Sequence, residues 1–192
     1  MKITGDAQQA ALYLWEVLAV VWLAGMFMTR RTARRQTGSS HFWQAGIMLF
    51  GAWLLFAKST GDAWLDAAAF PMTASAALTG MAITMGGVSF AIWARFTLGA
   101  NWSGIITIKE GHTLVRRGPY HFVRHPIYTG ILIGLVGTAL TRGTVHSILA
   151  LPVCAFGFWL KSVTEEQFML QQFGQEYLNY QRKVRGLVPF WF

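Results

Sequence analysis

Five apolar runs divide this chain, and polar or glycine-rich segments separate them. The runs cover residues 10–28, 42–57, 72–94, 127–140 and 145–160. About 20 apolar residues in a helix cross the ~30 Å hydrocarbon core of a bilayer. The pattern therefore predicts an all-α integral membrane protein with about five transmembrane helices.

The last two runs are short, at 14 and 16 residues, and only residues 141–144 lie between them. We expect a tight helical hairpin, with polar ends or a locally thinned bilayer making up the missing length. Gly130 and Gly134 have the spacing that lets helix backbones approach closely, so we expect them to pack this hairpin. Ala76 and Gly80 have the same spacing in the third run.

Polar residues interrupt and follow the runs. Glu16 lies inside the first run, and we expect it to face other helices. Residues 95–126 are polar and glycine-rich, with no apolar stretch long enough to span. From residue 161 the spacing of apolar residues predicts an amphipathic helix, broken or capped at Gly174. Its apolar face consists of Leu170, Phe173, Tyr177, Tyr180 and Val184.

No internal repeat or low-complexity linker divides the sequence, so we expect a single domain over residues 1–192. Residues 1–94 would form three scaffold spans, and residues 95–192 would carry the chemistry.

Composition agrees with a membrane protein. Of the 192 residues, 54% are hydrophobic and 12% charged, against roughly 25% charged in a soluble domain. The net charge of +8 does not indicate nucleic-acid binding, because the basic residues form no stripe interleaved with exposed aromatics. The single cysteine, Cys154, excludes an intrachain disulfide. The N-terminus lacks the basic region and cleavage site of a signal peptide, so we interpret the first run as a retained span.

The basic residues indicate the orientation of the chain. Four lie in residues 30–35, five in residues 95–124 and four in residues 161–185, and with five spans these segments share one side. That side holds 13 of the 16 basic residues, and the others are Lys2, Lys58 and Arg142. The positive-inside rule then predicts an external N-terminus, with the active site and the C-terminus cytoplasmic.

The stretch from Gly118 to Gly130 has the features of a binding site. Pro119 fixes a turn, and a second proline, Pro126, suits the first turn of a helix. The two residues before it, Arg124 and His125, are therefore held in non-helical backbone. The free N–H groups and partial positive charge of a helix N-terminus suit an anionic ligand group.

Polar residues of the cytoplasmic side form one candidate constellation. It consists of His112, Tyr120, Arg124, His125, Tyr128, Lys161, Glu165 and Glu166. Lys161 and Glu165 are also neighbours at i and i+4 on a helix, so a simple surface ion pair is the alternative for them. For the two tyrosines, the alternative is anchoring at the membrane interface.

Several segments around these residues carry the sequence motifs of a known family. They are Lys109-Glu110-Gly111-His112-Thr113-Leu114-Val115, Gly118-Pro119-Tyr120, Val123-Arg124-His125-Pro126 and Tyr128-x-Gly130, then Thr164-Glu165-Glu166, Phe173-Gly174-x-Glu176-Tyr177, Tyr180, Val184 and Pro189. In this order they resemble the isoprenylcysteine carboxyl methyltransferase family, which belongs with the phospholipid methyltransferase-like membrane enzymes. The resemblance covers residues 95–190, and residues 1–90 match only as membrane helices.

The resemblance implies an enzyme that uses S-adenosylmethionine. The cofactor would bind in a cytosolic pocket formed by the 95–126 segment, the last two spans and the C-terminal helix. The implied cofactor-binding residues are His112, Gly118, Tyr120, His125, Pro126, Tyr128 and Glu165. The carboxylate of the cofactor would suit the start of the fourth helix, and its ammonium would suit Glu165 or Glu166. A tyrosine ring would cover its adenine or its sulfonium.

Three residues are candidates for the chemistry itself: Arg124, Lys161 and Glu166. A carboxylate acceptor is already ionised and needs a cation to hold it. Members that methylate farnesyl-cysteine carry an arginine five residues before the second glutamate, and here that position is Lys161, a point charge without the bidentate fork. An amine or thiol acceptor would need a base, for which Glu166 is the candidate.

The sequence thus predicts an S-adenosylmethionine-dependent methyltransferase with a lipophilic or membrane-embedded acceptor. A carboxylate, as in isoprenylcysteine, is the first choice of acceptor, and a phospholipid amine or a small thiol is the second. Expected partners are the cofactor, a lipophilic or lipidated substrate and membrane lipids.

Two other classes compete with an enzyme of this kind. A small membrane transporter would show charged residues at mid-membrane depth or paired repeats, and Glu16 is the one acidic residue within a span. A membrane oxidoreductase would need more histidine ligands than His121 and His125, whose i, i+4 spacing Pro126 disrupts, so no metal site is expected.

Overall fold

The computed structural model describes residues 2–26, 32–35, 38–99, 107–109 and 113–187, with the backbone alone at 26, 32–35, 38–41 and 107–109. The elements are α1 (Lys2–Met26), β1 (Thr32–Arg35), α2 (Gly38–Phe56), α3 (Ala74–Leu98), β2 (Thr107–Lys109), a 3-10 turn η2 (Gly118–His121), α4 (Pro126–Arg142), α5 (Val145–Phe173) and α6 (Gln175–Lys183). The predicted helical class is confirmed. The antiparallel pairing of β1 with β2 was not expected.

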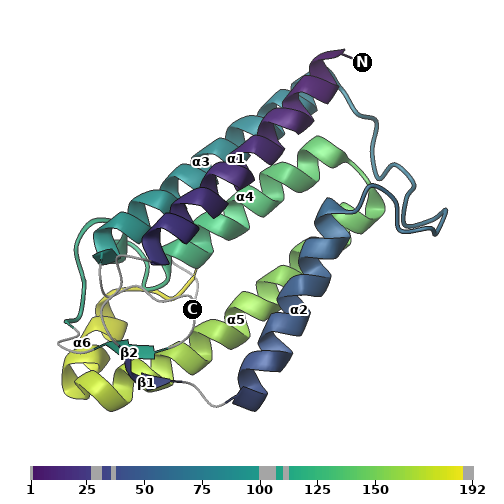
Figure 1. Ribbon diagram of the computed structural model, residues 1–192. Coiled ribbons are helices and arrows are strands. Elements are labelled where there is room, and N and C mark those ends of the chain that lie inside the picture. The colour runs from purple at the N-terminus through teal and green to yellow at the C-terminus, as the bar shows by residue number, and fades with distance from the viewer. Residues whose placement is uncertain (1, 27–31, 36–37, 100–106, 110–112, 188–192) are drawn as a thin grey trace.

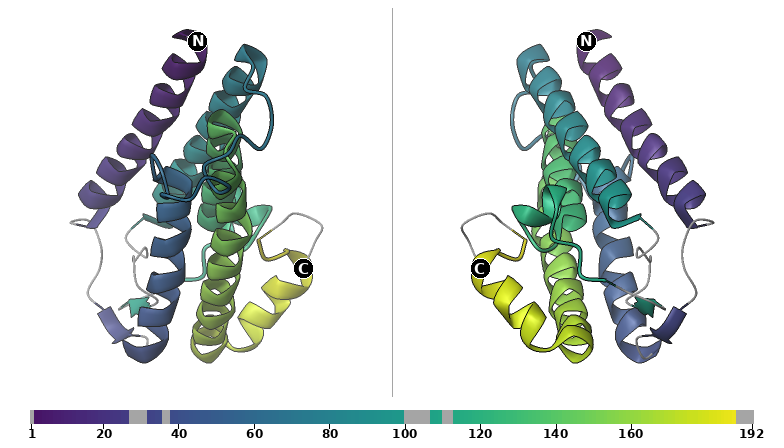
Figure 2. Two further views of the ribbon diagram at one scale, coloured as in Figure 1. Left: turned by 90° about the vertical axis from the view of Figure 1, so that its right-hand side faces the viewer. Right: turned by 90° about the vertical axis from the view of Figure 1, so that its left-hand side faces the viewer.

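The long helices form two groups. Helices α1, α3 and α4 lie side by side, and α2 packs along α5 (Figure 1). The groups meet near the turn between α4 and α5 and diverge toward the end that carries α6, β1 and β2, as Figures 1 and 2 show. The segments that hold most basic residues are therefore gathered at one end of the molecule.

Small residues bring α3 and α4 into backbone contact. A Cβ atom on Gly87 would lie 2.3 Å from the backbone nitrogen of Gly134, and one on Gly130 would lie 2.6 Å from that of Ala91. The expectation that Gly130 and Gly134 pack the hairpin of α4 and α5 is wrong. The reason is that α3 also carries glycine at the contact, whereas α5 meets α4 there with a large side chain, Phe158.

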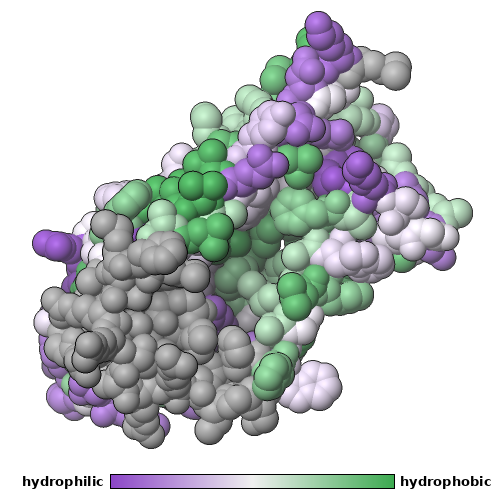
Figure 3. Space-filling view, in the orientation of Figure 1, coloured by the Kyte–Doolittle hydropathy of each residue, from purple (hydrophilic) through white to green (hydrophobic). Residues whose placement is uncertain are grey.

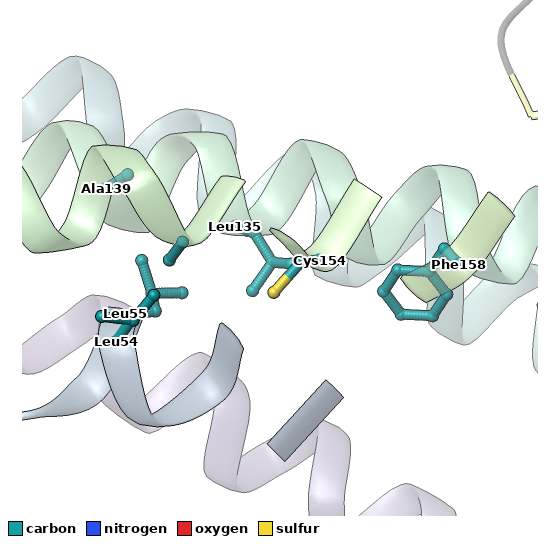
Figure 4. Packing of buried hydrophobic residues seen from close by; sticks show 7 residues of the cluster. Leu54, Leu55, Leu135, Ala139, Cys154 and Phe158 are labelled. Carbon is teal, nitrogen blue, oxygen red and sulfur yellow. The ribbon is translucent and has the colours of Figure 1, made fainter. Parts of the chain in front are cut away.

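A second core joins α2, α4 and α5. Figure 4 shows Leu54 and Leu55 of α2 beside Leu135 of α4 and Cys154 of α5. Leu55 is fully buried, and Cys154 is 3% exposed. The α4–α5 hairpin is therefore held by ordinary apolar side chains, and α2 contributes to the same core.

The outer surface is that of an integral membrane protein. Helices α1, α3 and α5 contain segments long and apolar enough to cross a bilayer, and α2 has a shorter apolar part, Phe42–Phe56. Figure 3 shows apolar residues over the middle of the face that it displays and in the hollow between the two helix groups. The total of five spans stays a prediction, because α2 and α4, with 19 and 17 residues, are short.

The outward face of α1 contradicts one expectation. Ala7, Ala11 and Leu18 are buried, but Glu16 is exposed. The prediction that Glu16 faces other helices is therefore wrong. Glu16 lies on the face of α1 that has no neighbouring helix in the described part of the chain.

The C-terminal helices follow the predicted amphipathic pattern. Helix α5 continues as one helix from its apolar part to Phe173. Gly174, with φ of 50°, ends α5, because the left-handed region suits glycine. Helix α6 then buries Tyr177 and Tyr180, so the predicted interruption at Gly174 is confirmed.

Candidate functional site

The start of α4 has the predicted backbone. Gly118 has φ of 59°, and the N–H groups of Phe122 and Val123 donate to the carbonyl of Pro119. His125 is the N-cap residue, with φ of −121° and ψ of 58°, and Pro126 is the first residue of α4. The two prolines therefore produce the turn and the helix start that the sequence indicated.

The segment after α6 accepts hydrogen bonds from two backbone N–H groups of this turn. The N–H of Arg124 donates to the carbonyl of Arg185 at 2.7 Å, and that of His125 donates to Gly186 at 3.2 Å. These donors are consequently occupied by the chain itself. They precede the first turn of α4, so the anion site expected from the free N–H groups of that turn stays a prediction.

Charged side chains join α4 to α5 directly below this turn. The guanidinium of Arg124 donates from Nε to Oε1 of Glu166 at 2.8 Å. Nε2 of His125 lies 3.0 Å from the same oxygen, and Nδ1 of His125 lies 3.5 Å from Oε2 of Glu165. Gln181 of α6 donates to the other oxygen of Glu166 at 2.8 Å. We call these five residues the glutamate cluster.

The two glutamates differ in their surroundings. Both oxygens of Glu166 accept hydrogen bonds from buried or half-buried donors, and its side chain is 19% exposed. Glu165 accepts from the hydroxyl of Tyr128 at 2.7 Å and is 35% exposed. Glu166 is therefore committed to holding the protein together, whereas Glu165 has an open side that a ligand can reach.

Tyr128 connects the cluster to the apolar core. Its ring stacks on that of His125, with centroids 5.5 Å apart and planes at 3°. It also packs on Phe158 at 5.1 Å, and Nζ of Lys161 lies 5.4 Å from its centroid. Lys161 thus places a cation beside the ring of Tyr128, one helical turn before Glu165 on α5.

The pKa of His125 reflects two opposing effects. Burial lowers it, but hydrogen bonds and charge from Glu165 and Glu166 outweigh burial and raise it above its usual 6.5. The imidazolium form is therefore favoured in the folded protein. It sits between two carboxylates, so the cluster carries little net charge.

Tyr120 forms the wall beside the cluster. Its backbone carbonyl accepts a hydrogen bond from the hydroxyl of Tyr180 at 2.5 Å. Burial raises the pKa of the Tyr120 phenol well above 10, and burial raises that of Tyr180 to about 12. Both hydroxyls thus stay protonated at neutral pH, and the proton of Tyr180 is used in its hydrogen bond to Tyr120.

A cavity of about 780 Å³ adjoins this wall. It lies between the C-terminal end of α3, residues 113–117 and Glu176 of α6, where Glu176 is ion-paired with Arg116. The core cluster of Ala94, Tyr120 and Ile127 separates it from the glutamates: Leu98 and Val115 pack on this cluster from the cavity side and Tyr128 from the other. Among the described residues, the cavity is lined by none of the predicted site residues.

Most of the predicted site residues come together. Arg124, His125, Tyr128, Lys161, Glu165 and Glu166 share the cluster or border it, and Gly118, Tyr120 and Pro126 shape the turn beside it. His112 lies outside the described residues. Sequence reasoning missed Gln181, because no motif marks it and its position against Glu166 depends on the docking of α6.

Comparisons with known proteins agree on one family. The family model described as phospholipid methyltransferase matches residues 75–176. Protein-S-isoprenylcysteine O-methyltransferase B of Arabidopsis thaliana is 36% identical over 100 residues, which are 50% of this chain and 51% of that protein. The human protein-S-isoprenylcysteine O-methyltransferase is 29% identical over 123 residues, or 59% of this chain and 41% of that protein. The chain thus spans about half the length of the relatives it matches, or less.

A solved structure shows the same fold. It is that of a eukaryotic intramembrane Ras methyltransferase (isoprenylcysteine carboxyl methyltransferase), with a TM-score of 0.50 and 21% identity. The likeness covers 81% of this chain and 54% of that one.

Proposed function

Because this chain belongs to the phospholipid methyltransferase family, we propose that it transfers a methyl group from S-adenosylmethionine to a lipophilic, membrane-embedded acceptor. One observation carries the proposal. Two adjacent glutamates project from α5 into the start of α4, where Glu166 is saturated by its neighbours and Glu165 remains 35% exposed. A carboxylate that is fixed in place yet reachable suits the ammonium group of the cofactor.

The residues of this region fit the parts of S-adenosylmethionine. Glu165, oriented by Tyr128 and His125, would bind the ammonium. The cavity of about 780 Å³ lies beyond the core cluster of Ala94, Tyr120 and Ile127, so we do not assign it to the cofactor. His112, Gly118, Tyr120 and Pro126 remain predicted pocket residues.

The cofactor supplies a methyl group already activated by a positively charged sulfur, so the protein has to align the acceptor and exclude water. Arg124 and Glu166 bind each other, and Arg124 also donates to the carbonyl of Val184. We therefore assign these two to positioning His125 and Glu165. Lys161 is the residue that we assign to the reacting groups.

A carboxylate acceptor is the proposal for this chain, and Lys161 would hold it as a counter-charge. The relatives that are named isoprenylcysteine O-methyltransferases support this choice. A lipid tail would suit the apolar hollow between the two helix groups, which Figure 3 displays. We place this site on the cytoplasmic side, where 13 of the 16 basic residues would lie.

The direct test is binding of S-adenosylhomocysteine to purified protein in detergent, measured by calorimetry. We expect binding to wild type, a large loss in Glu165→Gln, and no change in Asp62→Asn, a carboxylate at the opposite end of the molecule. A folded wild-type protein without affinity would sink the proposal. A screen with labelled cofactor, in which mass spectrometry identifies the methylated product, then separates a carboxylate from a phospholipid amine or a thiol.

A further inference from the structure

A cavity at the basic end of the molecule has no role in the proposed methyl transfer. It measures about 780 Å³ and lies between the last turn of α3, residues 113–117 and Glu176 of α6. The core cluster that contains Tyr120 separates it from the glutamate cluster. A ligand in this cavity is therefore distinct from the cofactor and from the methyl acceptor.

One wall of the cavity is apolar and continues into the outer surface of α3. Phe96 lines the cavity and is 66% exposed, and Trp93, one turn earlier on the same face, is 50% exposed. Met85 and Leu78 are exposed farther along this face. An acyl chain that lies along α3 can thus reach the cavity without leaving the hydrocarbon.

The cavity lies at the depth of the lipid headgroups. Helix α3 has 25 residues and is therefore roughly 37 Å long, whereas the hydrocarbon core of a bilayer measures about 30 Å. The last turn of α3, which lines the cavity, consequently extends into the headgroup layer. Trp93, one turn before this end, is of the residue type that is enriched at that boundary.

Another wall of the cavity carries positive charge. Arg116 and Arg117 line it, and Glu176 pairs with Arg116. The guanidinium of Arg116 also lies 5.9 Å from the ring centroid of Tyr180. Arg117 is exposed, and its side chain makes no hydrogen bond or ion pair within the described part of the chain. Two arginines against one glutamate leave the described lining with a net charge of +1.

The turn at Gly118 joins the charged wall to the apolar one. A Cβ atom on Gly118 would lie 3.2 Å from Oγ1 of Thr97 and 3.8 Å from the ring of Trp93. The preceding residue, Arg117, is thus held beside the lipid-facing surface of α3. A cation and an aromatic surface are therefore adjacent at the membrane boundary.

We propose that this cavity binds one anionic phospholipid, whose phosphate contacts Arg117 and whose acyl chain lies along Trp93 and Phe96. The planar guanidinium matches a phosphate group with two parallel N–H···O bonds. Arg117 is the main anchor, because Glu176 already neutralises Arg116. A zwitterionic lipid brings its own ammonium, which the net positive charge disfavours. Free phosphate would use the charged wall alone.

Native mass spectrometry of the full chain in detergent, after removal of bound lipid, tests this site. We expect wild type to bind one added phosphatidylglycerol per chain, and to bind phosphatidylcholine more weakly by roughly 5-fold or more. Arg117→Gln should weaken the binding of phosphatidylglycerol by roughly 5-fold, because one charge next to the phosphate is lost. The control, Arg182→Gln, removes an exposed charge of α6 that does not line the cavity, and should leave binding unaltered.

Photolabelling in liposomes locates the acyl chain. Phosphatidylglycerol with a diazirine in its acyl chain should label residues 93–99 in wild type, and less so in Arg117→Gln. Equal weakening by both arginine variants would show a diffuse attraction to the basic end and would overturn the proposal. Equal binding of phosphatidylcholine, displacement of the lipid by an equal concentration of inorganic phosphate, or labelling confined to other segments would each refute it as well.

Discussion

Nε2 of His125 lies 3.0 Å from Oε1 of Glu166. This contact joins the N-cap of α4 to α5, about two turns before α5 ends at Phe173. Arg124 binds the same oxygen, so adjacent residues before Pro126 converge on one carboxylate. Pro126 keeps His125 out of the helix, and the side chains of both residues reach α5. Glu166 is therefore a structural link whose loss affects the whole site.

We predict that Glu166→Ala destabilises the protein by about 3 kcal/mol or more, because it leaves the largely buried Arg124 without its ion pair. The matched change is Glu176→Ala, which removes an exposed pair with Arg116 and should cost about 1 kcal/mol or less. Unfolding in denaturant, followed by circular dichroism in detergent, measures both. Equal losses would contradict the assignment of Glu166.

His125 should make stability depend on pH. Its folded pKa is raised above 6.5 by Glu165 and Glu166, so its stabilising contribution is complete below about pH 6.5 and is lost as the pH rises through the folded pKa. The difference in melting temperature between wild type and His125→Gln should therefore shrink from pH 6 to pH 9. A difference that grows over this range would mean that the neutral ring is the stabilised form.

Two adjacent glycines of α3 give a matched pair of substitutions. Gly87→Ala should destabilise by roughly 1–3 kcal/mol, because the new methyl group would meet the backbone of α4. Gly86→Ala meets nothing within 4 Å and should be neutral or stabilising, since alanine is the better helix former. Thermal unfolding of both variants checks the pair. The contact of α3 with α4 would be misassigned if the order were reversed.

Lys161 should govern turnover of a carboxylate acceptor. We expect Lys161→Met to lower kcat/KM by roughly 10- to 100-fold, because a charged hydrogen bond to the acceptor is lost. Lys161→Arg should retain most of the activity, and both variants should still bind S-adenosylhomocysteine. Loss of cofactor binding in Lys161→Met would instead assign the residue to the cofactor.

The orientation can be checked on intact cells with single cysteines in a Cys154→Ala background. Ser59→Cys, in the loop before α3, should react with a membrane-impermeant maleimide from outside. Asn179→Cys, in α6 beside the site, should react only after the membrane is opened. The opposite pattern would reverse the topology predicted from the basic residues.

Local features of the site were readable in the sequence. Pro119, Pro126 and Gly174 control backbone conformation at their own positions, so the turn, the helix start and the end of α5 followed from residue type. Apolar runs and basic loops similarly indicated the helices and the end of the molecule that carries the site. These properties depend on neighbours in the chain.

Pairing between distant segments was decided only by the tertiary structure. The same spacing at Gly130 and Gly134 is compatible with a neighbour on either side, and α3 became that neighbour because it offers Gly87 opposite. Likewise, residue type does not distinguish Glu165 from Glu166, and the separate roles predicted for them did not come from their contacts. The sequence by itself determined a membrane protein with a motif at one helix start, because hydrophobicity, charge and proline act locally. Only the packing of α6 and α4 around α5 decided that Glu166 is saturated and Glu165 open, since that depends on which donors lie within about 3 Å.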